Sequence, residues 1–308
     1  MIRTLSEIID KPRRDCVYDI LSYLDLGLCV DVGAAAGHMT WRIRTAGGVR
    51  TRVVAFEPFP GNHEFFHQST IGLDNVTLIK KAVSDRVGKA EFTVPSVVQG
   101  TEPRWEKYTG YSSVGFLSPD EVDDAHPSIP SAEEARRPPP QQRLIVETTT
   151  IDTEFSVGEP IDFMKIDVQG GETRVLLGAD GMLRTRKINI LYIEWSGDPG
   201  VVRALGHHGY RIYDSTYMVI PRILDVKPFE RMGFEFIFET KPSTGKVAYH
   251  LRLTSKELSP SDAIEMVRKS SLGYIQTDLI AVSENSLGRF LEAAERYDGG
   301  NDQEPLPP

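Results

Sequence analysis

Short apolar runs alternate with amphipathic segments along the first third of the chain. Residues 28–32 form an apolar run followed directly by glycine, and residues 52–56 form another that is followed by an acid and a proline. Residues 38–46 carry apolar positions at helical spacing, and a second helix is expected after Gly61. Residues 75–83 are interpreted as a third strand. Strands and helices that alternate at such short intervals predict an α/β fold with a parallel sheet.

The alternation returns in the second half of the chain. The apolar pattern there predicts helices over 171–183 and 199–208 and strands over 161–168, 189–195, 210–216, 234–238 and 277–282. Apolar residues at helical spacing also precede residue 28. We therefore expect an N-terminal helical extension (1–27), a single α/β domain (28–297) and a tail (298–308) whose composition predicts disorder.

The pattern breaks between residues 95 and 143. The segment AEFTV before it indicates an added strand, but the stretch itself contains many of the chain's prolines and cannot be regular throughout. A connection of this length inside a compact domain is either functional or mobile. It contains Tyr111, Ser112 and Ser113, whose hydroxyls could cover a bound cofactor or meet a substrate. One hypothesis is that this insert forms a substrate lid.

Composition and charge narrow the class of protein. The chain has 308 residues, of which 40% are hydrophobic and 26% charged, and this is ordinary for a soluble globular protein. Its net charge of -9 argues against nucleic acid or an anionic membrane as a partner. Neither a signal peptide nor a membrane span is indicated, so we expect a cytoplasmic protein, with a homo-oligomer left open. Cys16 and Cys29 are expected to be buried and free.

The stretch VDVGAAAGHMT, residues 30–40, follows the first strand and leads into the first helix. In a parallel sheet, ligands bind beyond the carboxyl ends of the strands. Gly33 and Gly37 flank three alanines, so a ligand can approach the backbone closely. A dinucleotide fingerprint, GxGxxG, would require glycine where Ala35 and His38 stand. The loop is therefore a poor pyrophosphate site, and a dinucleotide-dependent oxidoreductase is the less favoured alternative.

A second acid stands at the end of the second strand. Glu57 follows Asp31 by 26 positions, and a carboxylate there can accept hydrogen bonds from both hydroxyls of a ribose. A ribose without a pyrophosphate fits S-adenosylmethionine, whose amino-acid end would lie near Asp31. Two structural alternatives remain open. Glu57 could be a solvated loop acid, and Asp31 could only tie down the loop through backbone N–H groups.

Several segments together resemble the FkbM family of S-adenosylmethionine-dependent methyltransferases. They are DVGAAAGHMT, AFEP, NVTLIKKAVSDRVGKAEF, YSSVG, and TIDTEF followed by IDFMKIDVQGGETRVLLGA, and they cover about residues 28–200. The resemblance implies a Rossmann-like class I methyltransferase fold with a mostly parallel seven-stranded sheet. It also implies O-methylation of a small hydroxylated acceptor, such as a sugar or a secondary metabolite. The implied cofactor contacts are Asp31, Gly33, Ala34, Gly37, Thr40, Glu57, Pro58, Ser84, Asp85 and Asp167.

Asp167, at the end of the fourth strand, is the expected general base. Lys165 lies two positions earlier and on the same face of that strand, where it could hold Asp167 ionised or touch the substrate. It could equally be a lysine that is only paired to a carboxylate. Glu194, at the end of the fifth strand, is a further catalytic candidate, with a surface or capping role as the alternative. Asp167 and Glu194 could also contribute to a divalent cation site, which we do not claim.

One residue departs from the family pattern. Gln169 stands where the family usually has glutamate, and an amide cannot take a proton from a nucleophile. If that position carried the base, the protein would be impaired or would use Asp167, Glu172 or Glu194 instead. A structural role is the other possibility, in which the amide satisfies backbone groups at the strand end. The main alternative is therefore a cofactor-binding or scaffold protein that lost its chemistry. Either Ser84 or Asp85 is expected to meet the adenine, and His38 is interpreted as a polar cap.

Overall fold

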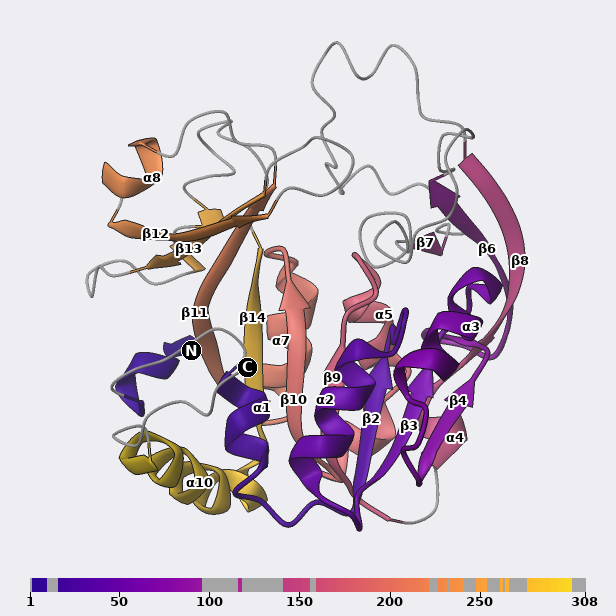
Figure 1. Ribbon diagram of the computed structural model, residues 1–308, viewed down its shortest axis with the longest axis horizontal. Helices are drawn as coiled ribbons and strands as arrows, with labels where there is room; N and C mark the ends of the chain where they lie inside the picture. Colours follow the sequence, from indigo (N-terminus) through magenta and orange to yellow (C-terminus); the bar gives the residue numbers. More distant parts are fainter. Residues whose placement is uncertain are drawn as a thin grey trace.

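The computed structural model describes residues 2–9, 16–95, 116–117, 141–155, 159–221, 227–231, 233–240, 248–253, 261–262, 264–265 and 276–300. A large twisted sheet runs through the molecule, with helices in front of it and behind it, and a smaller sheet lies at one side (Figure 1). No helix in the described ranges is long and apolar enough to cross a membrane.

The large sheet contains the predicted parallel core. Its order is β4 (Val76–Ile79), β3 (Arg52–Phe56), β2 (Leu28–Val32), β9 (Ile161–Ile166), β10 (Ile188–Trp195), β14 (Gln276–Val282) and β11 (Arg211–Pro221). The first five strands are mutually parallel, and β14 lies antiparallel between β10 and β11. The sheet reaches ten strands in the described residues through β13 (Ala248–Leu253), β12 (Phe234–Thr240) and β1 (Ile2–Thr4).

The direction of winding reverses between β2 and β9. From β2 the chain runs outward through β3 and β4, and it later returns to the other side of β2 as β9. Ligands in open α/β sheets bind at such a switch point, beyond the carboxyl ends of the strands. The strand register places Asp31, Lys165 and Tyr192 side by side across β2, β9 and β10. Their side chains therefore share one face at the switch point.

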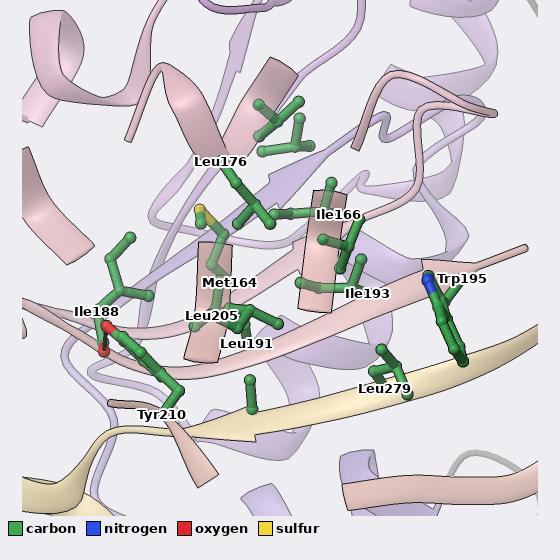
Figure 2. Close-up of a cluster of buried hydrophobic side chains, with 14 of the residues drawn as sticks. Met164, Ile166, Leu176, Ile188, Leu191, Ile193, Trp195, Leu205, Tyr210 and Leu279 are labelled. Carbon is green, nitrogen blue, oxygen red and sulfur yellow. Dashed lines mark hydrogen bonds between the residues drawn. The ribbon is translucent and has the colours of Figure 1, made fainter. Parts of the chain in front are cut away.

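Two helical layers bury the two faces of the sheet. Phe163 belongs to the cluster formed with α1 (Cys16–Leu21), α2 (His38–Gly47) and α10 (Leu287–Gly300). Its strand neighbour Met164 faces the opposite cluster, with α5 (Glu172–Leu177), α6 (Asp180–Arg184) and α7 (Pro199–His207), part of which Figure 2 shows. This alternation follows from the two-residue period of a strand. Cys16 and Cys29 are both buried and free, as predicted.

The smaller sheet corrects one predicted strand. Residues 75–83 form two strands, because β4 ends at Ile79 and β5 (Ala82–Val83) pairs with β8 (Gln141–Thr149) instead. The other members of the smaller sheet are β6 (Gly88–Pro95), which contains the predicted AEFTV strand, and β7 (Phe116–Leu117). Residues 96–115 and 118–140, including Tyr111, Ser112 and Ser113, lie outside the described residues. The remaining short elements are η1 (Leu5–Glu7), α3 (Pro60–Ser69), α4 (Ile151–Phe155), α8 (Lys227–Arg231) and η5 (Glu284–Ser286).

The predicted helix over 171–183 is two helices, α5 and α6. The break has a long-range cause, because the Asp152 carboxylate accepts hydrogen bonds from the backbone N–H groups of Gly181 (2.7 Å) and Met182 (2.9 Å). A side chain from α4 thus satisfies the first N–H groups of α6, a role that local sequence does not reveal. At the other end of the chain, α10 continues through Gly300 and includes three residues of the predicted tail, while residues 301–308 lie outside the described residues.

Candidate active site

Two strand-end loops meet at the switch point. Gly33 follows β2 with a φ of 81°, and a Cβ atom there would lie 1.9 Å from the backbone oxygen of Asp167, which follows β9. Gly37 has a φ of 85°, and a Cβ atom there would lie 2.9 Å from the Phe66 ring of α3. Both positions combine a left-handed backbone with close neighbours, so only glycine fits them without strain. The glycines thus let the loop after β2 pack against β9 and α3.

Glu57 holds the glycine loop in place. Its Oε2 accepts a hydrogen bond from the Ala35 N–H and its Oε1 accepts one from the Phe59 N–H, both at 2.8 Å. The side chain is only 4% exposed. Burial raises the pKa of this carboxyl to about 7, although the bonds from Phe59 and Ala35 lower it. Glu57 is therefore a buried tether of the loop, and each oxygen keeps a second lone pair for a ligand such as a ribose hydroxyl.

Ala35 stands at the middle-glycine position of the dinucleotide fingerprint. It adopts a φ of 46°, which is uncommon for a residue with a Cβ atom. Its N–H donates to Glu57, so that group is engaged and does not point freely at a pyrophosphate. The geometry of the loop therefore adds to the sequence argument against a dinucleotide. Ala34 and Pro58 flank these contacts, the first buried and the second partly buried.

Asp31 is fully buried and bonded to side chains. Its Oδ2 accepts a hydrogen bond from the Thr40 hydroxyl at 2.6 Å, and its Oδ1 lies 3.5 Å from Lys165 Nζ. Both contacts are to side chains, whereas the structural alternative for Asp31 expected hydrogen bonds from backbone N–H groups of the loop. Asp31 instead connects the end of β2 to α2 through Thr40 and to β9 through Lys165.

Lys165 links three acceptors on two loops. Its Nζ lies 3.2 Å from the Gly33 carbonyl oxygen, 3.3 Å from Asp167 Oδ2 and 3.5 Å from Asp31 Oδ1. The contact to Gly33 is a hydrogen bond, and the two carboxylates form ion pairs with the ammonium group. Burial lowers the pKa of Lys165, but the charges of Asp167 and Asp31 raise it overall, which keeps the side chain protonated. The contacts favour the paired-lysine alternative, since the ammonium group holds the loop and its two carboxylates.

Asp167 and Glu194 lie together with Gln169 between them. Gln169 Nε2 is 2.7 Å from Asp167 Oδ1 and 2.7 Å from Glu194 Oε2. Burial raises the pKa of the Asp167 carboxyl, but Lys165 and Gln169 lower it more, so it lies below its usual range. Burial together with the charges of Asp167 and Asp278 raises the pKa of Glu194 well above its usual range. The two carboxyl groups that accept from Gln169 are thus shifted in opposite directions, Asp167 toward its ionised form and Glu194 toward its protonated form.

The other predicted residues have different surroundings. Glu172 accepts hydrogen bonds from the backbone N–H groups of Val168 (3.1 Å) and Gly170 (3.0 Å), so it fixes the loop after β9. Ser84, at the end of β5, is buried and donates to Asp85 Oδ1 at 3.0 Å, while Asp85 is exposed. His38 begins α2 and is exposed. Among the described residues, no group of three or more His, Cys, Asp or Glu side chains is placed to hold a metal ion.

Sequence reasoning missed two polar residues beside this cluster. Asp278 of β14 is the register partner of Glu194, and the Tyr192 hydroxyl donates to Asp278 Oδ2 at 2.9 Å. The sequence did contain a sign that Asp278 is functional, because an aspartate inside the apolar run TDLIAV is unusual for a buried strand. It could be placed next to Glu194 only once the order and register of β10 and β14 were known.

The winding order and the glycine loop at the switch point define a Rossmann-like class I methyltransferase fold. Residues 31–212, more than half of the chain, match the methyltransferase FkbM domain. The chain therefore belongs to the FkbM methyltransferase family, as the resemblance indicated.

Three solved structures are among those that are similar to this chain. The methyltransferase FkbM from Methylobacillus flagellatus KT is 13% identical with a TM-score of 0.37, and the match covers 74% of this chain but only 43% of that one. Precorrin-6y C5,15-methyltransferase from Geobacter metallireducens GS-15 is 10% identical, with a TM-score of 0.39 and coverage of 92% and 95%. Aeropyrum pernix fibrillarin, which contains natively bound S-adenosyl-L-methionine, is 9% identical, with a TM-score of 0.29 and coverage of 77% and 73%. No curated protein matches this chain.

Proposed function

We propose that this protein uses S-adenosylmethionine to methylate a hydroxyl group on a small acceptor, such as a sugar or a secondary metabolite. One observation carries the proposal. The loop tethered by Glu57 and the half-buried carboxylate of Asp167 meet at the switch point of the sheet. A cofactor seated on the loop would therefore present its reactive group beside Asp167.

The residues at the switch point fit this cofactor. The loop from Gly33 to Gly37 carries no side chain larger than a methyl group, so a ligand can lie against its backbone. Glu57 offers carboxylate lone pairs at the end of β3, where the fold places a ribose. When bound, the cofactor supplies an electrophilic methyl group on a sulfonium. The protein's own contribution is to hold the acceptor oxygen in line with that group, and alignment accounts for much of the rate enhancement.

Asp167 is suited to receive the proton of the acceptor hydroxyl. Its side chain is 32% exposed, whereas those of Lys165 and Asp31 are 7% and 0% exposed. Among these three, Asp167 is thus the one that can contact an acceptor, and the other two position it. A carboxylate with a low pKa is a weak base, but it suffices here because the hydroxyl becomes strongly acidic as its oxygen bonds to the methyl carbon.

Gln169 does not remove the base in this arrangement. Gln169, the residue that departs from the family pattern, donates one hydrogen bond to Asp167, and Asp167 itself keeps a carboxylate. This supports an active enzyme over the alternative of a cofactor-binding protein without chemistry. The two are separated by measuring binding and turnover independently.

Calorimetry tests the cofactor. We expect S-adenosylmethionine and its demethylated product to bind, and NAD not to bind, because the Ala35 N–H is engaged by Glu57. Glu57→Ala should weaken cofactor binding strongly, since it frees the loop and deletes the ribose acceptor. Asp25→Ala, which removes an exposed carboxylate, serves as the matched control and should bind normally. Tight NAD binding, or unchanged affinity in Glu57→Ala, would exclude this cofactor site.

Mass spectrometry of hydroxylated metabolites incubated with the enzyme and cofactor tests the chemistry. Asp167→Asn should keep cofactor binding and lose methyl transfer, whereas Asp25→Asn should keep both. Methyl transfer by Asp167→Asn at the normal rate would show that Asp167 is not the base. Cofactor binding by the unaltered protein without transfer to any tested hydroxyl would favour the alternative without chemistry.

A further inference from the structure

A side-chain hydrogen bond joins the first turns of α5 and α7. The Thr173 hydroxyl of α5 donates to Asp198 Oδ2 at 2.5 Å. This distance is typical of a hydroxyl that donates to an ionised carboxylate. Asp198 Oδ1 accepts from the Gly200 N–H at 2.8 Å, so the same side chain also caps α7. One carboxylate therefore binds the starts of both helices.

The two helices are in close contact at this bond. A Cβ atom at Gly200 would lie 2.5 Å from Thr173 Oγ1 and 2.8 Å from Thr173 Cγ2. Carbon atoms in favourable contact are about 3.5–4.0 Å apart, so a larger residue at position 200 would displace Thr173 or separate the helices. The hydrogen bond thus belongs to a packed contact between α5 and α7.

On the α5 side, the bond leads to the loop that contains Asp167. Glu172 directly precedes Thr173, and its carboxylate accepts hydrogen bonds from the N–H groups of Val168 (3.1 Å) and Gly170 (3.0 Å). Both residues belong to the loop after β9, which begins with Asp167. The position of α5 therefore affects the position of this loop.

On the α7 side, the bond leads to the end of β10. The Asp198 carbonyl oxygen accepts a hydrogen bond from the Trp195 indole N–H at 2.8 Å, and Trp195 directly follows Glu194. Trp195 is only 6% exposed and belongs to the hydrophobic cluster of Figure 2. At the candidate active site, Gln169 joins the same two segments, because its amide contacts Asp167 and Glu194. The loops after β9 and β10 are thus connected at two separate points.

We propose that Thr173 is a positioning residue, whose hydrogen bond to Asp198 locks the loops after β9 and β10 together and so holds Asp167 in place for the methyl acceptor. The inference rests on the proposed function, because it assigns the lock to the alignment of a hydroxyl with Asp167. The groups proposed to seat the cofactor lie on other loops, after β2 and β3. Loss of the lock should therefore slow methyl transfer and spare cofactor binding.

Two substitutions separate the hydroxyl of Thr173 from its methyl group. Thr173→Val keeps the shape and removes the donor, whereas Thr173→Ser keeps the donor and removes the methyl group. If the hydrogen bond locks the loops, Thr173→Ser should behave like the unaltered protein and Thr173→Val should not. The reverse result would show that Thr173 acts only through packing, and it would overturn the proposal.

Hydrogen exchange followed by NMR reports the lock without a methyl acceptor. In Thr173→Val, exchange of the Val168 and Gly170 N–H groups and of the Trp195 indole N–H should be faster by about 10-fold or more, as expected when a hydrogen bond to a charged group is lost. Exchange in the central strand β2 should stay unchanged. An equal increase in β2 would indicate a general loss of stability, and no increase at the three groups would show that the bond locks nothing; either result would overturn the proposal.

Kinetics test the consequence for the reaction, with a hydroxyl compound that the mass-spectrometric experiment identifies as a methyl acceptor. Thr173→Val should lower kcat by about tenfold or more and leave the KM for S-adenosylmethionine unchanged, because a small misplacement of reacting groups slows transfer. Thr173→Ser should restore kcat. Thr185→Val is the matched control, because it removes an exposed threonine hydroxyl that donates to the Gly181 carbonyl oxygen at 2.7 Å, and it should behave normally.

A second variant covers the case in which Thr173→Val does not fold. Gly200→Ala favours the helix but places a methyl group against Thr173, so it should break the same contact from α7 and produce the same changes.

Cofactor calorimetry on the same samples separates the two proposals. If the unaltered protein binds no S-adenosylmethionine, the proposed function fails and the positioning role fails with it. If the unaltered protein transfers methyl groups and Thr173→Val and Gly200→Ala match its kcat, the positioning role alone fails and the proposed function stands.

Discussion

Replacement of Lys165 by methionine tests the centre of the site. The ammonium group is 7% exposed and lies 3.3 Å from Asp167 Oδ2 and 3.5 Å from Asp31 Oδ1. At an effective dielectric constant of about 20, each attraction amounts to about 5 kcal/mol before the cost of burying the charges is subtracted. Removal of one partner from a buried ion pair typically costs about 3–5 kcal/mol, because the other charge stays buried. We expect Lys165→Met to lower the free energy of unfolding by that amount.

Urea unfolding at neutral pH measures the loss, and the chain offers a matched control. Lys81 Nζ lies 3.2 Å from Glu154 Oε1, nearly the same distance, but the two side chains are 37% and 20% exposed. Lys81→Met should therefore cost only about 0.2–1 kcal/mol. The two lysines differ in burial and in their carboxylate contacts, which are Asp31 and Asp167 for Lys165 and Glu154 for Lys81, and scarcely in distance. Equal costs for them would refute the reasoning that burial makes Lys165 the centre of the site.

The free energy of unfolding should change with pH in a direction that follows from the shifted pKa values of Asp167 and Lys165. Burial raises the pKa of Asp167, but Lys165 and Gln169 lower it below 3.8, so its stabilising effect is present above that pH and is lost as the pH falls further. The opposite holds for Lys165, whose pKa is raised above 10.5, so its contribution is lost only in strong alkali. The cost of Lys165→Met should therefore be largest near neutral pH and shrink in acid, as the unpaired carboxylates become protonated.

Two further outcomes are expected. Gly33→Ala should lower the melting temperature far more than Gly48→Ala. Both glycines have a φ near 80°, a backbone conformation that costs alanine about 1–3 kcal/mol. Only at Gly33 does the new methyl group also meet a backbone oxygen, at 1.9 Å, so equal melting temperatures would contradict the close packing of the two loops. Burial raises the pKa of Glu57 from 4.5 to about 7, so its contribution to stability should fall by roughly 3 kcal/mol as the pH rises through that window. Urea unfolding across this range should show a flatter profile for Glu57→Gln, and identical profiles would argue against the raised pKa.

Local patterns predicted the parts of the fold that depend on local interactions. The parallel core follows from short apolar runs, because its strands are buried on both faces, and α2 follows from apolar positions at helical spacing. The predicted strand 75–83 failed at the point where the chain moves from one sheet to the other, which depends on the pairing of β5 with β8. The predicted helix 171–183 failed where Asp152 caps α6 from another element. In both cases the deciding partner is distant in sequence.

The candidate site, like the fold, was predicted only in the parts that depend on local sequence. Spacing alone placed Lys165 and Asp167 on one face, and the strand-end rule brought Asp31 and Glu57 to one edge of the sheet. At position 169, the sequence left open a lost base or a structural role for the amide. Its two hydrogen bonds show it as a donor between two acids. The role of an amide depends on its hydrogen-bond partners, and here they come from the loop after β9 and from β10. The effect of this departure from the family pattern is therefore best measured at the two carboxyl groups that Gln169 contacts, Asp167 and Glu194.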